Sequence, residues 1–426
     1  MKLPMSIKQR VYQYRKDIFF LVSNISTPAF GFAGSILAAK FLTPFEFGVS
    51  QTVMLIPSYF FFMQLGVYSG LNRNIPYYQG KGDLEKVERQ TSTSYKFSFY
   101  NAMVGIVFAF GFLIYHLIAE KSRLYAWMDI AIIAFFIFQP FYTHFDTLLR
   151  SKQDFKASAR YTFFDNVLNL TCSISMIFLG YTGMILKNAN TFILGYLYRY
   201  RYVLKRDGVR AKFYKDEFTD LVKVGVPIAL AGYFYSLNVV ADRSVVALTL
   251  NPQSVGVYSI SNLIIVAFQT LPTAISMLIY PRAAHLYGQT NSMQSLRKFI
   301  YLALIINIAA ILPFALIGYF YVDQVITMFL PKYTAGIGAA RVSCLTSVSL
   351  AYMGCNIVFL VAKKNHIYIA GLCITLILTW ILGKLFLSYG YGLEGVAWAK
   401  LISNSFLFVF VVAVSLFLTR RNLQEA

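Results

Sequence analysis

The sequence repeats Leu42-Thr-Pro-Phe-Glu-Phe-Gly-Val49 as Leu250-Asn-Pro-Gln-Ser-Val-Gly-Val257, 208 residues further along the chain. In each copy the proline begins a turn, and the glycine gives the backbone the freedom to enter the next helix. Two further pairs of segments recur at similar offsets, Asn74–Tyr77 with Ile279–Arg282 and Arg150–Gln153 with Ala362–Asn365. This self-similarity predicts that the chain consists of two related halves.

The composition predicts a membrane protein. The chain has 426 residues, of which 58% are hydrophobic and only 13% are charged, and its mean hydropathy is +0.58. A soluble domain carries about a quarter charged residues. A chain this long and this apolar cannot hide its surface in a water-soluble core, so lipid must be part of its solvent.

Twelve stretches are long and apolar enough to be predicted as membrane-spanning helices. They are residues 18–42, 49–71, 95–118, 130–149, 161–181, 184–203, 222–249, 256–281, 299–322, 341–362, 367–389 and 396–418. The sixth is the weakest, because Arg199 and Arg201 interrupt its end.

The placement of Lys and Arg predicts the topology. With both termini in the cytoplasm, the connections on the cytoplasmic side hold 29 of the 38 Lys and Arg, the outward connections hold six, and three lie inside spans. Such an asymmetry is typical of membrane proteins, whose cytoplasmic loops collect cations. The net charge of +20 therefore needs no nucleic-acid partner.

The repeats and the topology together predict the architecture. Both copies of each repeated segment fall on the same side of the membrane, which indicates parallel halves related by an axis along the membrane normal. We expect an all-α polytopic membrane protein of about 12 helices in two six-helix lobes, residues 1–204 and 221–426, joined by a cytoplasmic linker at 205–220. This is a transporter layout, with the substrate site between the lobes.

Enzyme signatures are absent from the sequence. It contains no phosphate-binding G-x-x-x-x-G-K-[ST] loop and no H-E-x-x-H motif. The four histidines do not cluster at metal-ligand spacing, and four scattered cysteines suit neither a disulfide framework nor a metal site. The outward loops are too short for a catalytic domain. We expect a protein that is not an enzyme and needs no cofactor or metal.

Ionisable residues inside spans are the first candidates for a site, because burying a charge in a membrane is costly. Asp242 and Arg243 are adjacent in the seventh span, so their side chains point about 100° apart. We expect one of them to face the central cavity while the other contacts a neighbouring helix; the alternative is a structural ion pair. Arg243 is the only arginine that we expect in the interior of a span. Lys40, Lys384 and Lys400 lie near outward helix ends, where extension to the interface explains them.

A second group of charges lies at the inward end of the fourth span. Asp146 and Arg150 are spaced for an i, i+4 ion pair, His144 is nearby, and Asp165 opens the fifth span. A structural ion pair is the simpler interpretation, and coupling to a proton or cation by Asp146, His144 or Asp165 is the alternative.

Two further features have simple interpretations. Pro57 and Pro272 fall in repeat-equivalent spans and are possible hinges. The run Tyr196-Leu-Tyr-Arg-Tyr-Arg-Tyr202 is typical of a membrane-interface belt, with its guanidinium groups toward anionic lipid; stacking of tyrosines on carbohydrate is the alternative.

Several motifs resemble those of the polysaccharide repeat-unit (O-antigen type) flippases of the multidrug/oligosaccharidyl-lipid/polysaccharide exporter superfamily. They are Gly225-Val-Pro227, Asp242-Arg243, Val255-Gly-Val-Tyr-Ser259, Leu278-Ile-Tyr-Pro-Arg282 and Tyr389-Gly-Tyr-Gly-Leu-Glu-Gly-Val-Ala397. Leu42–Gly48 and Tyr389–Ala397 resemble the first and last outward turns of that family, so the match covers nearly the whole chain. The resemblance implies two six-helix bundles with spans one, two, seven and eight lining a central cavity.

The resemblance also implies a substrate and a location. The substrate would be an undecaprenyl-pyrophosphate-linked oligosaccharide, moved from the inner to the outer leaflet of the bacterial cytoplasmic (inner) membrane for O-antigen or capsule assembly. Possible partners are a polysaccharide polymerase and a chain-length regulator, besides the lipid bilayer. We expect Arg243 to contact the pyrophosphate, with Asp242, Lys40 and Arg73 completing the substrate-binding set.

Two alternatives stay open at this point. An ion-coupled multidrug cation antiporter of the same superfamily would have a net acidic cavity. A flippase for peptidoglycan precursors carries a basic–acidic pair in its first span, whereas Gly34-Ser35 occupy that place here, 208 residues before Asp242-Arg243. This difference argues against the peptidoglycan role.

Overall fold

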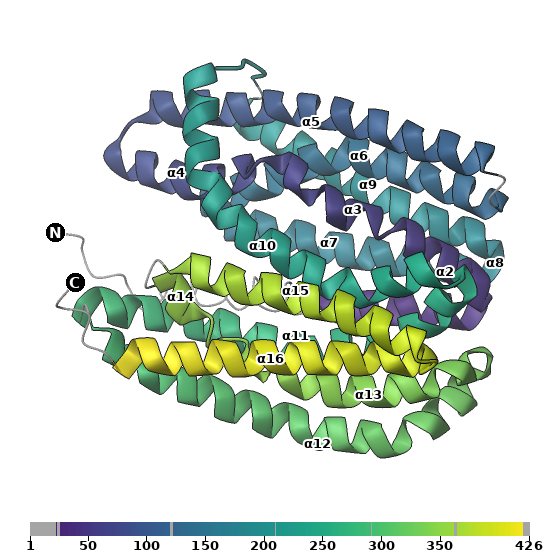
Figure 1. The fold of residues 1–426 in the computed structure, drawn as a ribbon. Coiled ribbons are helices and arrows are strands. Elements are labelled where there is room, and N and C mark those ends of the chain that lie inside the picture. The colour runs from purple at the N-terminus through teal and green to yellow at the C-terminus, as the bar shows by residue number, and fades with distance from the viewer. Residues whose placement is uncertain are drawn as a thin grey trace. The chain divides into compact units, whose positions relative to one another are not determined.

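The chain folds into helices throughout the part that the computed structural model describes, which is residues 23, 26–119, 122–208, 210–290, 292–361 and 364–420. No strand occurs among these residues. Figure 1 follows the helices along the chain.

Among the described residues, the first half of the chain contains helical residues 26–41 and then nine further helices. They are α2 (Pro44–Val53), α3 (Ile56–Tyr59), η1 (Phe60–Gln64), α4 (Val67–Lys81), α5 (Leu84–Ile118), α6 (Arg123–Ser151), α7 (Phe155–Ile174), α8 (Met176–Leu179) and α9 (Tyr181–Asp207).

The second half begins with the two longest unbroken helices of its sequence and ends with a helical hairpin. Its elements are α10 (Lys215–Thr249), α11 (Pro252–Thr290), η2 (Met293–Leu296), α12 (Arg297–Phe329), η3 (Pro331–Gly336), α13 (Ile337–Val348), η4 (Ser349–Tyr352), α14 (Ile357–Val361), α15 (Asn365–Ser388) and α16 (Gly392–Arg420). The hairpin is α15 and α16, which lie side by side.

The helices have the length and apolar character of membrane spans. Among the described residues nine helices could cross a membrane, or ten if the bent pair Pro44–Gln64 and Val67–Lys81 is one span. The chain is therefore a multi-pass membrane protein. Twelve spans stay a prediction, because part of the first lies outside the described residues and α9, which carries Arg199 and Arg201, is not among the nine.

The helices group into two compact units. Unit 1 contains the described residues up to Ala38 together with Phe60–Ala229, and unit 2 contains Ala39–Tyr59 together with Leu230–Ala426. The predicted lobes at 1–204 and 221–426 stay a prediction. In each unit a hydrophobic cluster fills the interior, around Leu71, Phe145 and Leu148 in unit 1 and around Ile300, Phe359 and Leu372 in unit 2.

The repeated segment begins a helix in both copies. In α2, Thr43 and Glu46 form a reciprocal capping box: the backbone N–H of Thr43 donates to Glu46 Oε2 at 2.8 Å, and the Glu46 N–H donates to Thr43 Oγ1 at 3.2 Å. In α11, Asn251 Oδ1 accepts from the Ser254 N–H at 2.8 Å. The proline follows the cap in each case, where its missing N–H costs nothing. The similarity in sequence is thus a similarity in local structure.

Candidate functional site

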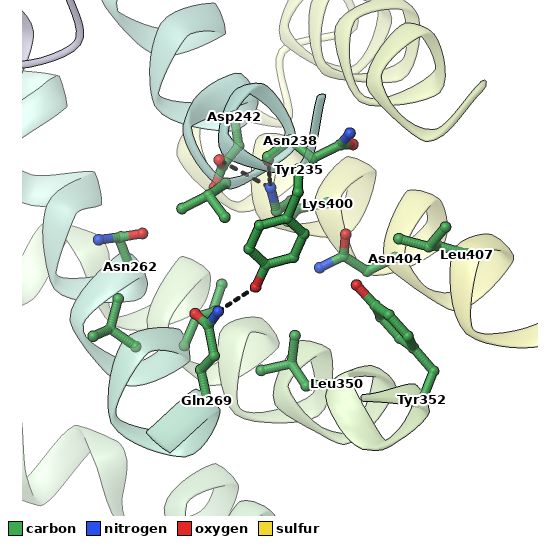
Figure 2. A pocket seen from close by; sticks show the side chains of 13 residues that line it. Tyr235, Asn238, Asp242, Asn262, Gln269, Leu350, Tyr352, Lys400, Asn404 and Leu407 are labelled. Atoms are coloured by element: carbon green, nitrogen blue, oxygen red, sulfur yellow. Dashed lines mark hydrogen bonds and ion pairs between the residues drawn. The ribbon is translucent and has the colours of Figure 1, made fainter. Parts of the chain in front are cut away.

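Asp242 is a buried carboxylate that has a cation and a hydroxyl group as neighbours inside unit 2. It is 1% exposed on α10, and Lys400 of α16 is 4% exposed. The Lys400 Nζ lies 3.3 Å from Asp242 Oδ1, and the Tyr258 hydroxyl donates to Asp242 Oδ2 at 2.9 Å. Lys400 also donates to the backbone carbonyl of Asn238, as Figure 2 shows. The prediction that Lys400 extends to the interface is wrong. Lys400 lies eight residues into α16, about 12 Å along the helix, and its ammonium group pairs with the buried Asp242 instead.

Arg243 points to a different neighbour. Its Nη1 donates to Gln51 Oε1 of α2 at 3.0 Å. Its Nε is buried without a hydrogen-bond partner, and no carboxylate within the described residues lies within 4.0 Å of the guanidinium. The divergence of Asp242 and Arg243 follows from their spacing, since adjacent helical residues point about 100° apart. One charge of the pair is thus neutralised, whereas the other is not.

A small polar pocket adjoins the Asp242–Lys400 pair (Figure 2). Its volume is about 30 Å³. Its polar lining comes from three helices and the η4 turn: Tyr235, Asn238, Asn262, Gln269, Tyr352 and Asn404. One water molecule needs about 10–15 Å³ of such cavity volume. The pocket therefore has room for about two waters and is too small for a sugar ring.

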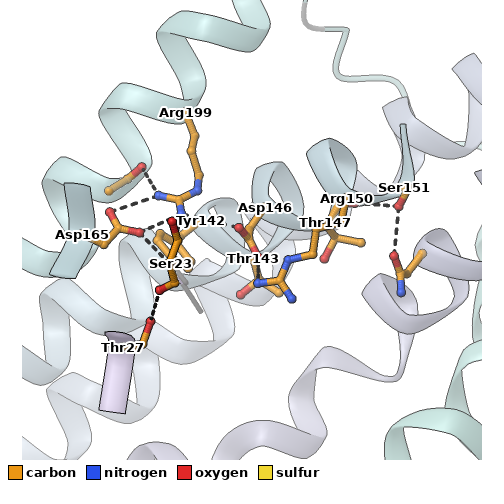
Figure 3. A network of polar contacts seen from close by, with 12 residues as sticks. Ser23, Thr27, Tyr142, Thr143, Asp146, Thr147, Arg150, Ser151, Asp165 and Arg199 are labelled. Atoms are coloured by element: carbon orange, nitrogen blue, oxygen red, sulfur yellow. Dashed lines mark hydrogen bonds and ion pairs between the residues drawn. The ribbon is translucent and has the colours of Figure 1, made fainter. Parts of the chain in front are cut away.

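The second polar cluster lies in unit 1 and centres on Arg199 of α9, which is 0% exposed. Its guanidinium donates two hydrogen bonds to Asp165 of α7, from Nη2 to Oδ2 at 2.7 Å and from Nη1 to Oδ1 at 3.2 Å. Nη2 also lies 3.5 Å from Asp146 Oδ1 of α6. The ring of Tyr142 stacks 4.3 Å from the guanidinium carbon, and its hydroxyl donates to Asp165 Oδ2 at 2.9 Å. Figure 3 shows this network.

Arg150 completes the charge balance of this cluster. Its Nη2 lies 2.6 Å from Asp146 Oδ2, which confirms the predicted i, i+4 ion pair (Figure 3). Two carboxylates are thus opposed by two guanidinium groups. His144, also predicted for coupling, is buried nearby, and its Nδ1 lies 3.1 Å from the Ser94 hydroxyl. Coupling roles for Asp146, His144 and Asp165 stay predictions.

Arg199 corrects two expectations from the sequence. It does not reach anionic lipid, and Arg243 is not the only arginine inside a helix of membrane length. Tyr196 and Tyr200 of the supposed belt pack against the hydrophobic cluster of unit 1, whereas Tyr198 and Arg201 are exposed. The reason is helical geometry: within one run of seven residues, only one face can point to lipid. A signal was available, since Asp165 in the fifth predicted span had no predicted counter-ion and Arg199 lies in the sixth.

The remaining predicted site residues lie elsewhere. Lys40 and Arg73 are exposed, so neither joins the buried pair of unit 2. Pro57 lies in α3, and the 49° bend between the two parts of that span falls after it, where Leu65 and Gly66 have positive φ. Pro272 lies within the continuous α11. The roles of these four residues stay predictions.

A model of a polysaccharide biosynthesis protein family matches residues 36–335, which is more than half of the chain. The chain belongs to this family. Among curated protein sequences, none matches this polysaccharide biosynthesis protein. Several solved structures share this fold at low sequence identity.

Three of these structures are transporters of the MOP superfamily. A multidrug resistance MATE family transporter in its inward-facing conformation has 16% identity and a TM-score of 0.73, over 95% of this chain and 100% of that chain. A transporter from Pyrococcus furiosus, whose binding pocket is described as having reverse polarity, has 16% identity and a TM-score of 0.65, over 95% and 94%. An outward-facing MATE transporter has 17% identity and a TM-score of 0.64, over 95% and 94%. At such identities the likeness establishes the fold, which is that of the MOP-superfamily transporters.

Proposed function

We propose that this polysaccharide biosynthesis protein is a flippase for lipid-linked oligosaccharides. It would move an undecaprenyl-pyrophosphate-linked repeat unit from the inner to the outer leaflet of the bacterial cytoplasmic membrane, with both chain termini in the cytoplasm. The family match and the transporter fold support transport in polysaccharide assembly. O-antigen and capsule are both possible products of such a pathway.

The observation that carries the proposal is the isolated charge on Arg243. A guanidinium with a buried, unpartnered Nε and, among the described residues, no carboxylate within 4.0 Å is costly to fold. A buried charge without a counter-ion is a candidate for a functional site. Guanidinium groups bind phosphate oxygens bidentately, and Gln51, the present partner of Arg243, is an uncharged group that a pyrophosphate can replace.

The second candidate is a multidrug cation antiporter, which the fold of the solved transporters favours. A cation substrate or coupling ion would need a carboxylate that lacks a counter-ion. Asp242 is paired with Lys400, Asp165 with Arg199, and Asp146 with Arg150. The pairing of these three carboxylates, beside an Arg243 that has no ion pair among the described residues, favours an anionic substrate.

The test is genetic complementation. A bacterial strain that lacks its own repeat-unit flippase is given this gene, and both surface polysaccharide and resistance to cationic drugs are measured. The proposal predicts restored surface polysaccharide and unchanged drug resistance. Drug resistance without surface polysaccharide would overturn the proposal in favour of the antiporter.

A further inference from the structure

The two adjacent charges of α10 differ because, in the described part of the chain, one has a counter-ion and the other has none. Asp242 and Arg243 follow one another in the chain, yet no ion pair joins them within the described residues. Asp242 is instead opposed by Lys400, whose Nζ lies 3.3 Å away. An unopposed Asp242 would be the nearest negative charge to Arg243 and would weaken the attraction of Arg243 for any anion.

The ammonium group of Lys400 is buried against two groups of α10. It is 4% exposed, and its ammonium group lies between Asp242 Oδ1 and the carbonyl oxygen of Asn238, to which it donates. Figure 2 shows both contacts on the same side of the α10 backbone. Tyr258 takes the other oxygen of Asp242 at 2.9 Å. The cation nearest to Oδ1 is therefore Lys400, and Oδ2 accepts from Tyr258, while Oδ1 accepts no hydrogen bond from the described residues.

We infer that Lys400 is a positioning residue for anion binding: by neutralising Asp242, it leaves the positive charge of Arg243 available to a pyrophosphate group. This inference rests on the proposed function. It adds to that function the residue that sets the charge near Arg243. Lys400 itself does not touch the substrate.

A purely structural role for Lys400 makes a different prediction from an electrostatic one. If the pair only holds α10 against α16, removing either partner damages the protein in the same direction. If Lys400 sets the charge near Arg243, removing Lys400 adds one net negative charge there, and removing Asp242 adds one net positive charge. The two substitutions then have unequal effects on anion affinity.

The experiment measures binding of inorganic pyrophosphate to the purified full-length protein by isothermal titration calorimetry. We expect Lys400→Met to weaken binding by about tenfold, as the loss of one nearby charge does. Asp242→Asn should bind no more weakly than wild type. The double variant Asp242→Asn/Lys400→Met should bind within about twofold of wild type. Lys384→Met is the matched control, because Lys384 is an exposed cation of the same unit, and it should not change the affinity.

The outcomes separate the role of Lys400 from the proposed anion contact of Arg243. Equal weakening by Lys400→Met and Asp242→Asn, or loss of binding in the double variant, would overturn the role of Lys400. The double variant keeps the test valid if Lys400→Met does not fold, since it removes both members of the Asp242–Lys400 pair and leaves neither of them unpaired. A wild-type protein that does not bind pyrophosphate, or that binds it equally well after Arg243→Met, would instead contradict the proposed anion contact.

Discussion

A Cβ atom on Gly48 would lie 1.7 Å from the carbonyl oxygen of Pro252, and a Cβ on Gly256 would lie 1.9 Å from that of Pro44. The repeated segments are thus not only similar in sequence: in unit 2 the glycine of each copy packs on the proline carbonyl of the other. The obstacle is backbone in both cases, so no side-chain rotation can relieve it. This reciprocal contact explains why both copies need glycine at the same place in the repeat.

Gly48→Ala and Gly256→Ala should each separate α2 from α11. Overpacking of this kind costs about 1–3 kcal/mol, and we expect a lower melting temperature and lower membrane abundance for both variants. Gly232→Ala is the control, because nothing lies within 4 Å of a Cβ at that helical position. Melting temperatures of the purified variants in detergent check this. A Gly48→Ala protein as stable as the Gly232→Ala protein would show that the helices approach less closely.

Arg199→Met should destabilise unit 1 strongly. The substitution leaves Asp165 without the guanidinium that binds both of its oxygens, and breaking such a buried pair costs about 3–5 kcal/mol. Membrane abundance, measured by immunoblot, should fall sharply. Arg201→Met should have little effect, since Arg201 is exposed two residues further along α9.

A double substitution tests whether the unpaired charge on Asp165 causes the loss of abundance in Arg199→Met. Arg199→Met/Asp165→Asn removes both members of the closest pair, so it should recover part of the abundance that Arg199→Met loses. No recovery would indicate that packing of Arg199 against Tyr142 matters more than its charge.

Gln90→Leu should loosen the start of α10. The Gln90 amide donates to Glu217 Oε2 at 3.0 Å and to Asp220 Oδ2 at 2.8 Å, and Gln90 is 0% exposed. Loss of hydrogen bonds to charged acceptors costs about 1.5–3 kcal/mol. Limited proteolysis of membranes should cleave the variant faster within residues 205–220, whereas Gln79→Leu, at an exposed position, should be cleaved at the wild-type rate.

The helical, multi-pass character of the chain could be predicted because its signals are physical and local. Apolar stretches of membrane length and the separation of cations from spans follow directly from the cost of burying charge in lipid. The prediction that Pro44 and Pro252 begin turns is wrong: each proline begins a helix, and the glycine lies inside it. Proline directly after a capping residue is the local pattern that indicates such a helix start.

The partners of buried charges could not be predicted in the same way. Lys400 lies 158 residues from Asp242 along the chain, and no periodicity connects them. A lysine near a helix end is explained equally well by extension to the interface, and only packing of α16 against α10 decides between the two. Arg199 was missed because tyrosines surround it, and these tyrosines resemble an interface belt when burial is unknown.

The proposed function depends most on Arg243, and surface polysaccharide in a complemented strain is the measurement that tests it. Arg243→Ala should lose nearly all transport and Arg243→Lys much of it, because lysine keeps the charge but not the bidentate geometry. Both variants should stay abundant in the membrane, and Lys384→Ala should be fully active. An abundant Arg243→Ala protein that restores wild-type levels of surface polysaccharide would contradict the anion-binding role of Arg243.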